Sequence, residues 1–193
     1  MSGNYISQAA IFLVQLFFDI FILAFLLRYL LTKLRINSYN PLSEVIIRVT
    51  NPVLKPLRRM IPGYYGFDWS SIVALLLIQS LEIIITQLII RGDVIAINAL
   101  FILTMANLLK MILYIYMFTI IIQVIISWIN PSAYNPIVTI MSQLTDPILR
   151  PVRRIASFGG GLDFSPLIVL VIIQLLMILI ISPLMEIGFR LSY

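Results

Sequence analysis

The segment TNPVLKPLRR at residues 50–59 recurs as TDPILRPVRR at residues 145–154, which lies 95 positions further along the chain. The correspondence extends without a gap over residues 40–79 and 135–174, where 14 of 40 positions are identical. Any two membrane helices share Leu and Ile by chance, but shared Pro, Gly, Asp and Arg positions need another explanation. The chain is therefore a tandem duplication of one structural unit.

Long apolar runs flank both copies of this segment. We predict membrane spans over about residues 8–32 and 69–90 in the first copy, and over about residues 106–128 and 166–189 in the second. An α-helix needs about 20 apolar residues to cross the hydrocarbon core of a bilayer. The predicted fold is an all-α membrane protein with about four transmembrane helices, arranged as two parallel helical hairpins.

The repeat divides the chain into residues 1–94, with a long loop over 33–68, and residues 95–193, with a long loop over 129–165. Residues 94–105 fit either an interfacial segment or a tilted extension of the third span. Two hairpins in series place both long loops on the same side of the membrane. We therefore expect the hairpins to pack about a pseudo-twofold axis along the membrane normal.

The composition supports a bilayer environment. Apolar residues make up 61% of the chain and charged residues 11%, with a mean hydropathy of +1.07, whereas soluble domains carry about 25% charged residues. The absence of Cys and His excludes thiol nucleophiles, His bases and Cys or His metal ligands. The sequence predicts no enzymatic activity and no cofactor.

The excess of basic residues indicates an orientation. The two long loops hold nine of the 13 Lys and Arg residues. Cytoplasmic loops of membrane proteins are enriched in these residues, so we expect cytoplasmic loops and termini on the outer side. This explains the net charge of +5 better than direct binding of nucleic acid does.

Each long loop contains the signature of a short amphipathic helix. Asn40-Pro41 and Asn135-Pro136 combine a favourable N-cap with proline at the first helical position, and apolar residues follow at helical spacing. Such a helix lies in the membrane interface or packs on the ends of the spans. Asn51-Pro52 and Asp146-Pro147 are expected to end it, because the residue before proline avoids the helical conformation.

Two groups of charged or polar residues are candidate functional positions. The first group follows the loop prolines and could contact anionic lipid head groups or an acidic partner, or could serve only to set the topology; it consists of Lys55, Arg58, Arg59, Arg150, Arg153 and Arg154. The second group lies within the spans, where ionisable residues need a partner or a task; it consists of Asp19, Arg28, Gln79, Glu82, Lys110 and Gln174.

For the second group, structural pairing is the preferred interpretation. Glu82 and Lys110 have similar expected depth on consecutive spans and could form an ion pair, and Gln79 and Gln174 are repeat equivalents suited to hydrogen bonds between spans. Arg28 near the end of its span could extend its side chain to the interface. Asp68 and Asp163 are expected to cap the second and fourth spans.

The duplicated pattern NP…T[ND]PxL[KR]PxRR…GxDxS…Q, flanked by spans, resembles the YggT family of small bacterial membrane proteins. Plastid and cyanobacterial YlmG-like proteins resemble a single copy. The second copy departs from the first at Ala156-Ser157, where the first has Ile61-Pro62. The resemblance implies an inner-membrane protein without established biochemical activity, in a family linked to osmotic tolerance, to cell-division or nucleoid organisation, and to assembly of other membrane complexes. It carries over no catalytic residue.

The sequence therefore predicts a non-enzymatic scaffold or assembly factor that acts through its basic cytoplasmic loops. Its expected partners are membrane lipids with anionic head groups, other membrane proteins and further copies of itself. The alternative is a small channel or ion-flux component that uses the ionisable residues within the spans.

Overall fold

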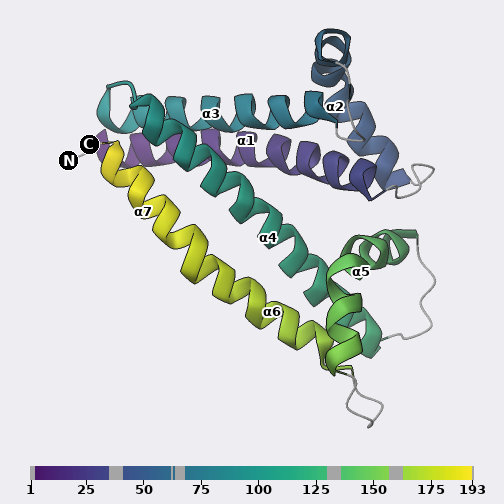
Figure 1. Ribbon diagram of the computed structural model, residues 1–193. Helices are drawn as coiled ribbons and strands as arrows, with labels where there is room; N and C mark the ends of the chain where they lie inside the picture. Colours follow the sequence, from purple (N-terminus) through teal and green to yellow (C-terminus); the bar gives the residue numbers. More distant parts are fainter. Residues whose placement is uncertain are drawn as a thin grey trace.

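The computed structural model describes residues 3–34, 41–61, 63, 68–129, 136–156 and 163–192, and it is built from helices (Figure 1). In chain order the elements are α1 (Gly3–Lys33), α2 (Pro41–Met60), α3 (Trp69–Arg91), α4 (Ile97–Ile129), α5 (Pro136–Ala156), α6 (Ser165–Leu176), a π-helical turn (Met177–Ile181) and α7 (Ser182–Leu191).

Among the described residues, four helical segments are long and apolar enough to cross a membrane, as predicted. They are α1, α3, α4 and the continuous run formed by α6, the π-helical turn and α7. The third span begins at Ile97, earlier than expected, so residues 97–105 extend α4 and are not a separate interfacial segment. Ala99 and Leu103 in this extension are buried together with Ile95 and pack against Ile83 and Ile84 of α3.

The helix ends follow local sequence signals. The Asp68 carboxylate caps α3 by accepting a hydrogen bond from the Ser71 amide at 3.3 Å. Asp163 accepts one from the Ser165 amide at 2.9 Å, although Phe164 is the residue directly before α6. The helix α3 ends at Gly92, whose φ of +76° is favourable only for glycine and a few other residues. Asn40 and Asn135, the expected caps of the loop helices, lie outside the described residues.

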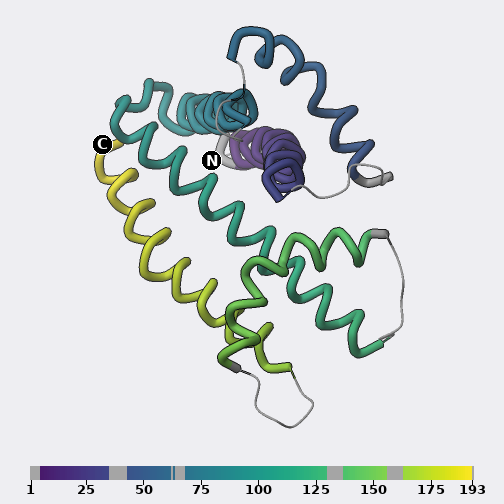
Figure 2. Tube along the Cα trace, turned by 45° about the vertical axis from the view of Figure 1, so that its right-hand side comes forward, coloured from purple at the N-terminus to yellow at the C-terminus, as the bar shows by residue number. Residues whose placement is uncertain are grey.

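The prediction that the loop prolines end the amphipathic helices is wrong. The helix α2 continues through Pro52 and Pro56, and α5 continues through Pro147 and Pro151. All four prolines are exposed, and a spacing of four residues places the two prolines of each helix on one side. The lost backbone hydrogen bonds therefore fall on the outer side, and both helices bend along their length without ending (Figure 2).

The spans form two hairpins, one of α1 with α3 and one of α4 with α6 and α7 (Figure 1). The hairpins meet at the end that carries both chain termini and diverge toward α2 and α5. Where they meet, the Ser80 and Thr104 hydroxyls lie 3.1 Å apart, and the Arg91 guanidinium donates to the Ser192 carbonyl at 2.9 Å. The two units thus touch mainly through α3 and α4, with further contacts of α5 with the first unit's hydrophobic cluster and between the ends that carry the chain termini.

The expected pseudo-twofold packing of the hairpins is also wrong. A twofold axis would give repeat equivalents the same surroundings, yet Gln79 is buried and Gln174 is exposed. The same difference separates Leu26 from its equivalent Ile121, and Leu30 from Ile125. Each unit therefore uses a different face in the contact between them, which is a head-to-tail arrangement.

A close contact between α4 and α7 yields a test of the second hairpin. A Cβ atom added at Gly188 would lie 2.6 Å from the buried Leu103 side chain, so we expect Gly188→Val to lower the free energy of unfolding by about 1–3 kcal/mol through overpacking. The midpoint of thermal unfolding in detergent micelles measures this. Adding Leu103→Ala should restore part of the loss, and an unchanged midpoint for Gly188→Val alone would contradict the packing.

Candidate functional site

The helices α2 and α5 form the most distinctive repeated feature outside the spans. Each is amphipathic and turns one face toward the ends of the spans in its own unit. Leu54 and Thr50 of α2 are fully buried, as are their equivalents Leu149 and Thr145 of α5. The outer faces carry the prolines and most of the basic residues. The structure thus favours packing on the span ends for the inner face of each helix.

Arg28 joins α1 to α2. Its Nη1 atom donates to the Thr50 hydroxyl at 2.5 Å, to the Asn51 side-chain oxygen at 2.9 Å and to the Ile47 carbonyl at 3.2 Å. The side chain is buried, so it does not extend to the interface as expected. A buried guanidinium held by neutral acceptors fixes α2 on the end of the first span, because moving α2 away would leave the charge without partners.

Gln123 of α4 occupies the position equivalent to Arg28 and makes the corresponding connection to α5. Its Nε2 atom donates to the Ser142 hydroxyl at 2.9 Å, and its Oε1 atom accepts from the Thr145 hydroxyl at 2.7 Å. Thr145 is the equivalent of Thr50. The duplication has therefore kept the connection between span and loop helix while replacing a charged donor by a neutral amide.

A second repeated contact ties the far end of each loop helix to the next span. Arg58 forms an ion pair with Asp68, and its equivalent Arg153 donates to Asp163 at 2.8 Å. Burial raises the pKa of the Asp68 carboxyl, but hydrogen bonds from Arg58 and Ser71 outweigh it and hold the net pKa below its usual value. The Asp68 carboxylate is thus charged at neutral pH.

The Asp163 carboxyl behaves in the same way. Burial raises its pKa, and hydrogen bonds from Ser165 and Arg153 outweigh this effect, so that the net pKa is lowered. We call the two contacts of each loop helix, one to the preceding span and one to the following span, its clasps. Each of the two helices is clasped at equivalent positions.

The clasps divide the six basic loop residues into two classes. Arg58 and Arg153 belong to the clasps, and Arg150 pairs with Asp146 at 2.8 Å. Lys55, Arg59 and Arg154 are exposed and have no ion pair with any residue in the described ranges. Of the candidates for lipid or partner contact, these three are the ones that remain available.

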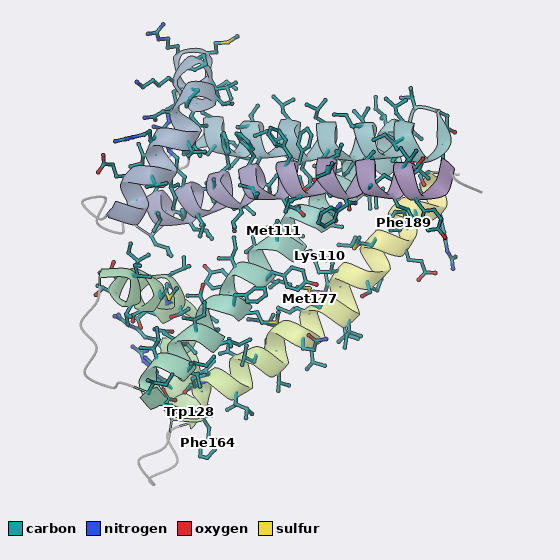
Figure 3. All side chains as sticks on the ribbon, turned by 180° about the vertical axis from the view of Figure 1, so that it is seen from behind. Lys110, Met111, Trp128, Phe164, Met177 and Phe189 are labelled. Carbon is teal, nitrogen blue, oxygen red and sulfur yellow. The ribbon has the colours of Figure 1, made fainter. Side chains whose placement is uncertain are left out.

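The ionisable residues of the spans are arranged differently from expectation. Glu82 accepts a hydrogen bond from Gln79 of its own helix at 2.7 Å, and no salt bridge joins it to Lys110, although both residues are described. Lys110 lies over the Tyr114 ring, 5.7 Å from its centre, and interacts electrostatically with Asp19 (Figure 3 labels Lys110). The Gln174 side chain makes no hydrogen bond within the described part of the chain, and the residue is exposed.

Thr50, Asn51 and Ser142 are site residues that sequence reasoning missed. Thr50 recurs as Thr145, and the pairs Arg58 with Asp68 and Arg153 with Asp163 are each separated by ten residues. That constant spacing of opposite charges was a usable signal. Ser142 is the repeat equivalent of Ile47. Because the two residue types differ, a comparison of the two copies could not have identified Ser142.

The exposed cations of the loop helices can recognise anionic groups. Among the described residues no group of three or more Asp or Glu side chains could hold a metal ion. The exposed groups are cations on a rigidly held helix, and cations of this kind bind phosphate or carboxylate groups.

The contact of Arg28 with α2 can be tested by replacing Arg28 with glutamine, the residue that occupies the equivalent position 123 in the second unit. Arg28→Ala removes the donor and leaves buried acceptors unsatisfied, so we expect a loss of about 2–3 kcal/mol in the free energy of unfolding. Arg28→Gln should cost less than Arg28→Ala, because the new amide oxygen can accept from the Thr50 hydroxyl as Gln123 accepts from Thr145, although the bond from Gln123 to Ser142 has no side-chain counterpart at Ile47. Thermal unfolding in detergent and hydrogen exchange of α2 measure both. Equal damage from the two substitutions would contradict the equivalence of the clasps.

The repeated architecture has counterparts in other proteins. Residues 7–89 and residues 102–184 each match the family model described as CCB3/YggT. An uncharacterised protein of Pseudomonas aeruginosa is 38% identical over 192 residues, covering 93% of this chain and 91% of the relative. The uncharacterised protein YggT of Escherichia coli K12 is 30% identical over 166 residues, covering 86% and 85%. No solved structure matches the chain.

The two matched segments are separated by the same 95 positions as the duplicated motif, since 102 − 7 = 95 and 184 − 89 = 95. The resemblance inferred from that motif is thereby confirmed. With two copies of the family segment, and four helices in its described part that are long and apolar enough to span a membrane, the chain belongs to the CCB3/YggT family.

Proposed function

We propose that this protein is a non-enzymatic membrane scaffold that presents two basic amphipathic helices at the cytoplasmic surface of the bacterial inner membrane. The observation that carries the proposal is the double clasping of α2 and α5 at equivalent positions in both units. A helix held at both ends keeps its outer face in a fixed position relative to the bilayer. Scaffolding needs such a fixed surface and no reactive group.

The available cations give this surface a chemical preference. Lys55, Arg59 and Arg154 are exposed on the loop helices and unpaired within the described residues. Each such charge near an anionic leaflet contributes about 1 kcal/mol, so three contribute about 3 kcal/mol, or roughly a hundredfold in affinity. The first ligands of the scaffold are therefore anionic lipid head groups, and the organisation of other membrane proteins would follow from that anchoring.

A channel remains the second candidate. The observation in its favour is that Asp19 of α1 interacts electrostatically both with Glu82 of α3 and with Lys110 of α4. However, the two acids are not repeated: Tyr114 and Met177 are their equivalents. A polar cluster whose two acids have no acidic equivalents in the second unit suits pairing between helices better than a path through the duplicated structure.

The proposed orientation can be tested separately. The helix termini Gly3 and Leu191 lie at one end of the molecule, with α2 and α5 at the other (Figure 1). Given nine basic residues in the long loops, a reporter fused after Tyr193 should be active only if it functions in the periplasm. A reporter inserted after Ala156 should show the opposite result. Cytoplasmic activity after Tyr193 would refute the orientation.

The scaffold proposal predicts that the three available cations recruit anionic lipid. A photoreactive residue at Met60, which is exposed beside Arg59, should capture phosphatidylglycerol in native membranes. The triple variant Lys55→Gln, Arg59→Gln, Arg154→Gln should reduce that capture about a hundredfold, because it removes about 3 kcal/mol of attraction.

Two controls make this experiment specific. Arg48→Gln removes another exposed cation of α2, which is already paired with Glu44 at 3.0 Å, and it should leave the capture nearly unchanged. A photoreactive residue at Phe12, an exposed position of α1, reports lipid contact away from the loop helices. Equal capture by the triple variant and the unmodified chain would contradict the proposal.

A further inference from the structure

The contact between the two units buries a defined set of residues of the second unit. Leu108 and Ile115 of α4 and Ile140 and Leu144 of α5 belong to the hydrophobic cluster built on α1, α2 and α3 of the first unit. They do not belong to the cluster of their own unit, which contains Ile120, Leu149, Val169 and Ile173. We call these four residues the back face of the second unit.

The first unit has the same back face, but nothing in the chain covers it. Shifting each position by 95 gives Leu13 and Ile20 of α1 and Val45 and Val49 of α2, all of them apolar. These four side chains are 43–62% exposed, whereas the four of the second unit are 3–8% exposed. A surface that packs against protein in one copy of the unit is thus open in the other.

The complementary surface shows the opposite asymmetry. In the first unit Leu26, Leu30 and Gln79 are buried and Ile83 is partly buried, and we call these residues its front face. Their equivalents in the second unit are Ile121, Ile125, Gln174 and Ile178, and all four are exposed. Within one chain, the back face of the first unit and the front face of the second unit are therefore left uncovered.

Contact with lipid explains the exposure of apolar residues on a span, but it does not explain why the polar side chain of Gln174 is exposed there. A side-chain amide in hydrocarbon lacks the hydrogen bonds that water supplies, and this is costly. Its equivalent Gln79 is buried and donates to Glu82. Amide side chains in spans commonly bond across helices, so Gln174 marks the front face of the second unit as a surface for another helix.

We propose that a second copy of this chain covers these faces, with the back face of its first unit docked on the front face of the second unit. The contact already present inside the chain supplies the template. Two copies related by a twofold axis make the contact twice and close a ring of four units, which leaves no back or front face open. This proposal is independent of the scaffold function and of lipid binding.

The ring can be tested with cysteines, because the chain has none of its own. We expect Val49→Cys in one copy and Ile125→Cys in another to crosslink in native membranes when the two variants are co-expressed. The corresponding positions within one chain are Leu144 and Leu30, and that pair of cysteines serves as the intramolecular reference.

Leu77 and Ile172 provide the matched control pair. They are repeat equivalents, and both are exposed in their own units, so neither lies on a face used between units. Cysteines at these positions should give several-fold less dimer than the pair at Val49 and Ile125.

The mass of the unmodified protein in nanodiscs is the second measurement, and we expect two copies. A single copy would overturn the proposal whatever the crosslinks show. Two copies without the crosslink between Val49 and Ile125, or with equal reaction of the control pair, would also overturn it, because the copies would then meet through other faces.

Discussion

Hydrocarbon offers no hydrogen-bond partner to a polar group, and this constraint explains most of the architecture of the protein. Spans become helices because only a helix satisfies its own backbone in lipid. Polar side chains near the span ends must then find protein partners. Arg28 and Gln123 find theirs on the loop helices, and the aspartates that begin the returning spans find arginines. The need for hydrogen-bond partners thus explains both the helical spans and the contacts that hold the loop helices on the span ends.

The clasps also explain why α2 and α5 tolerate two prolines each. Proline inside a helix costs about 3 kcal/mol or more, and an isolated segment of this composition would break. Here one face of each helix is buried against span ends, and the prolines lie on the other. Packing on the inner face offsets the missing bonds, and the resulting bend lets the helix follow the curved surface formed by two span ends.

Duplication in one chain has not produced a symmetric molecule. The two units carry similar surfaces, but they meet back to front, so each surface is covered in one unit and open in the other. The two units also differ in their polar residues. Arg28 corresponds to Gln123, and the acids Asp19 and Glu82 correspond to Tyr114 and Met177. Asp19, Glu82 and Lys110 interact where the first unit meets α4.

The sequence alone determined the number of spans, the duplication, the amphipathic loop helices and the family. Each of these depends on composition or on residue spacing along the chain, which hydrophobicity and helix geometry convert directly into local structure. The partners of Arg28, the continuation of helices through proline, and the separation of Gln79 from Gln174 were decided only by the tertiary structure. These features depend on which surfaces meet, and two units with nearly the same pattern along the chain can meet through the same face or through different ones.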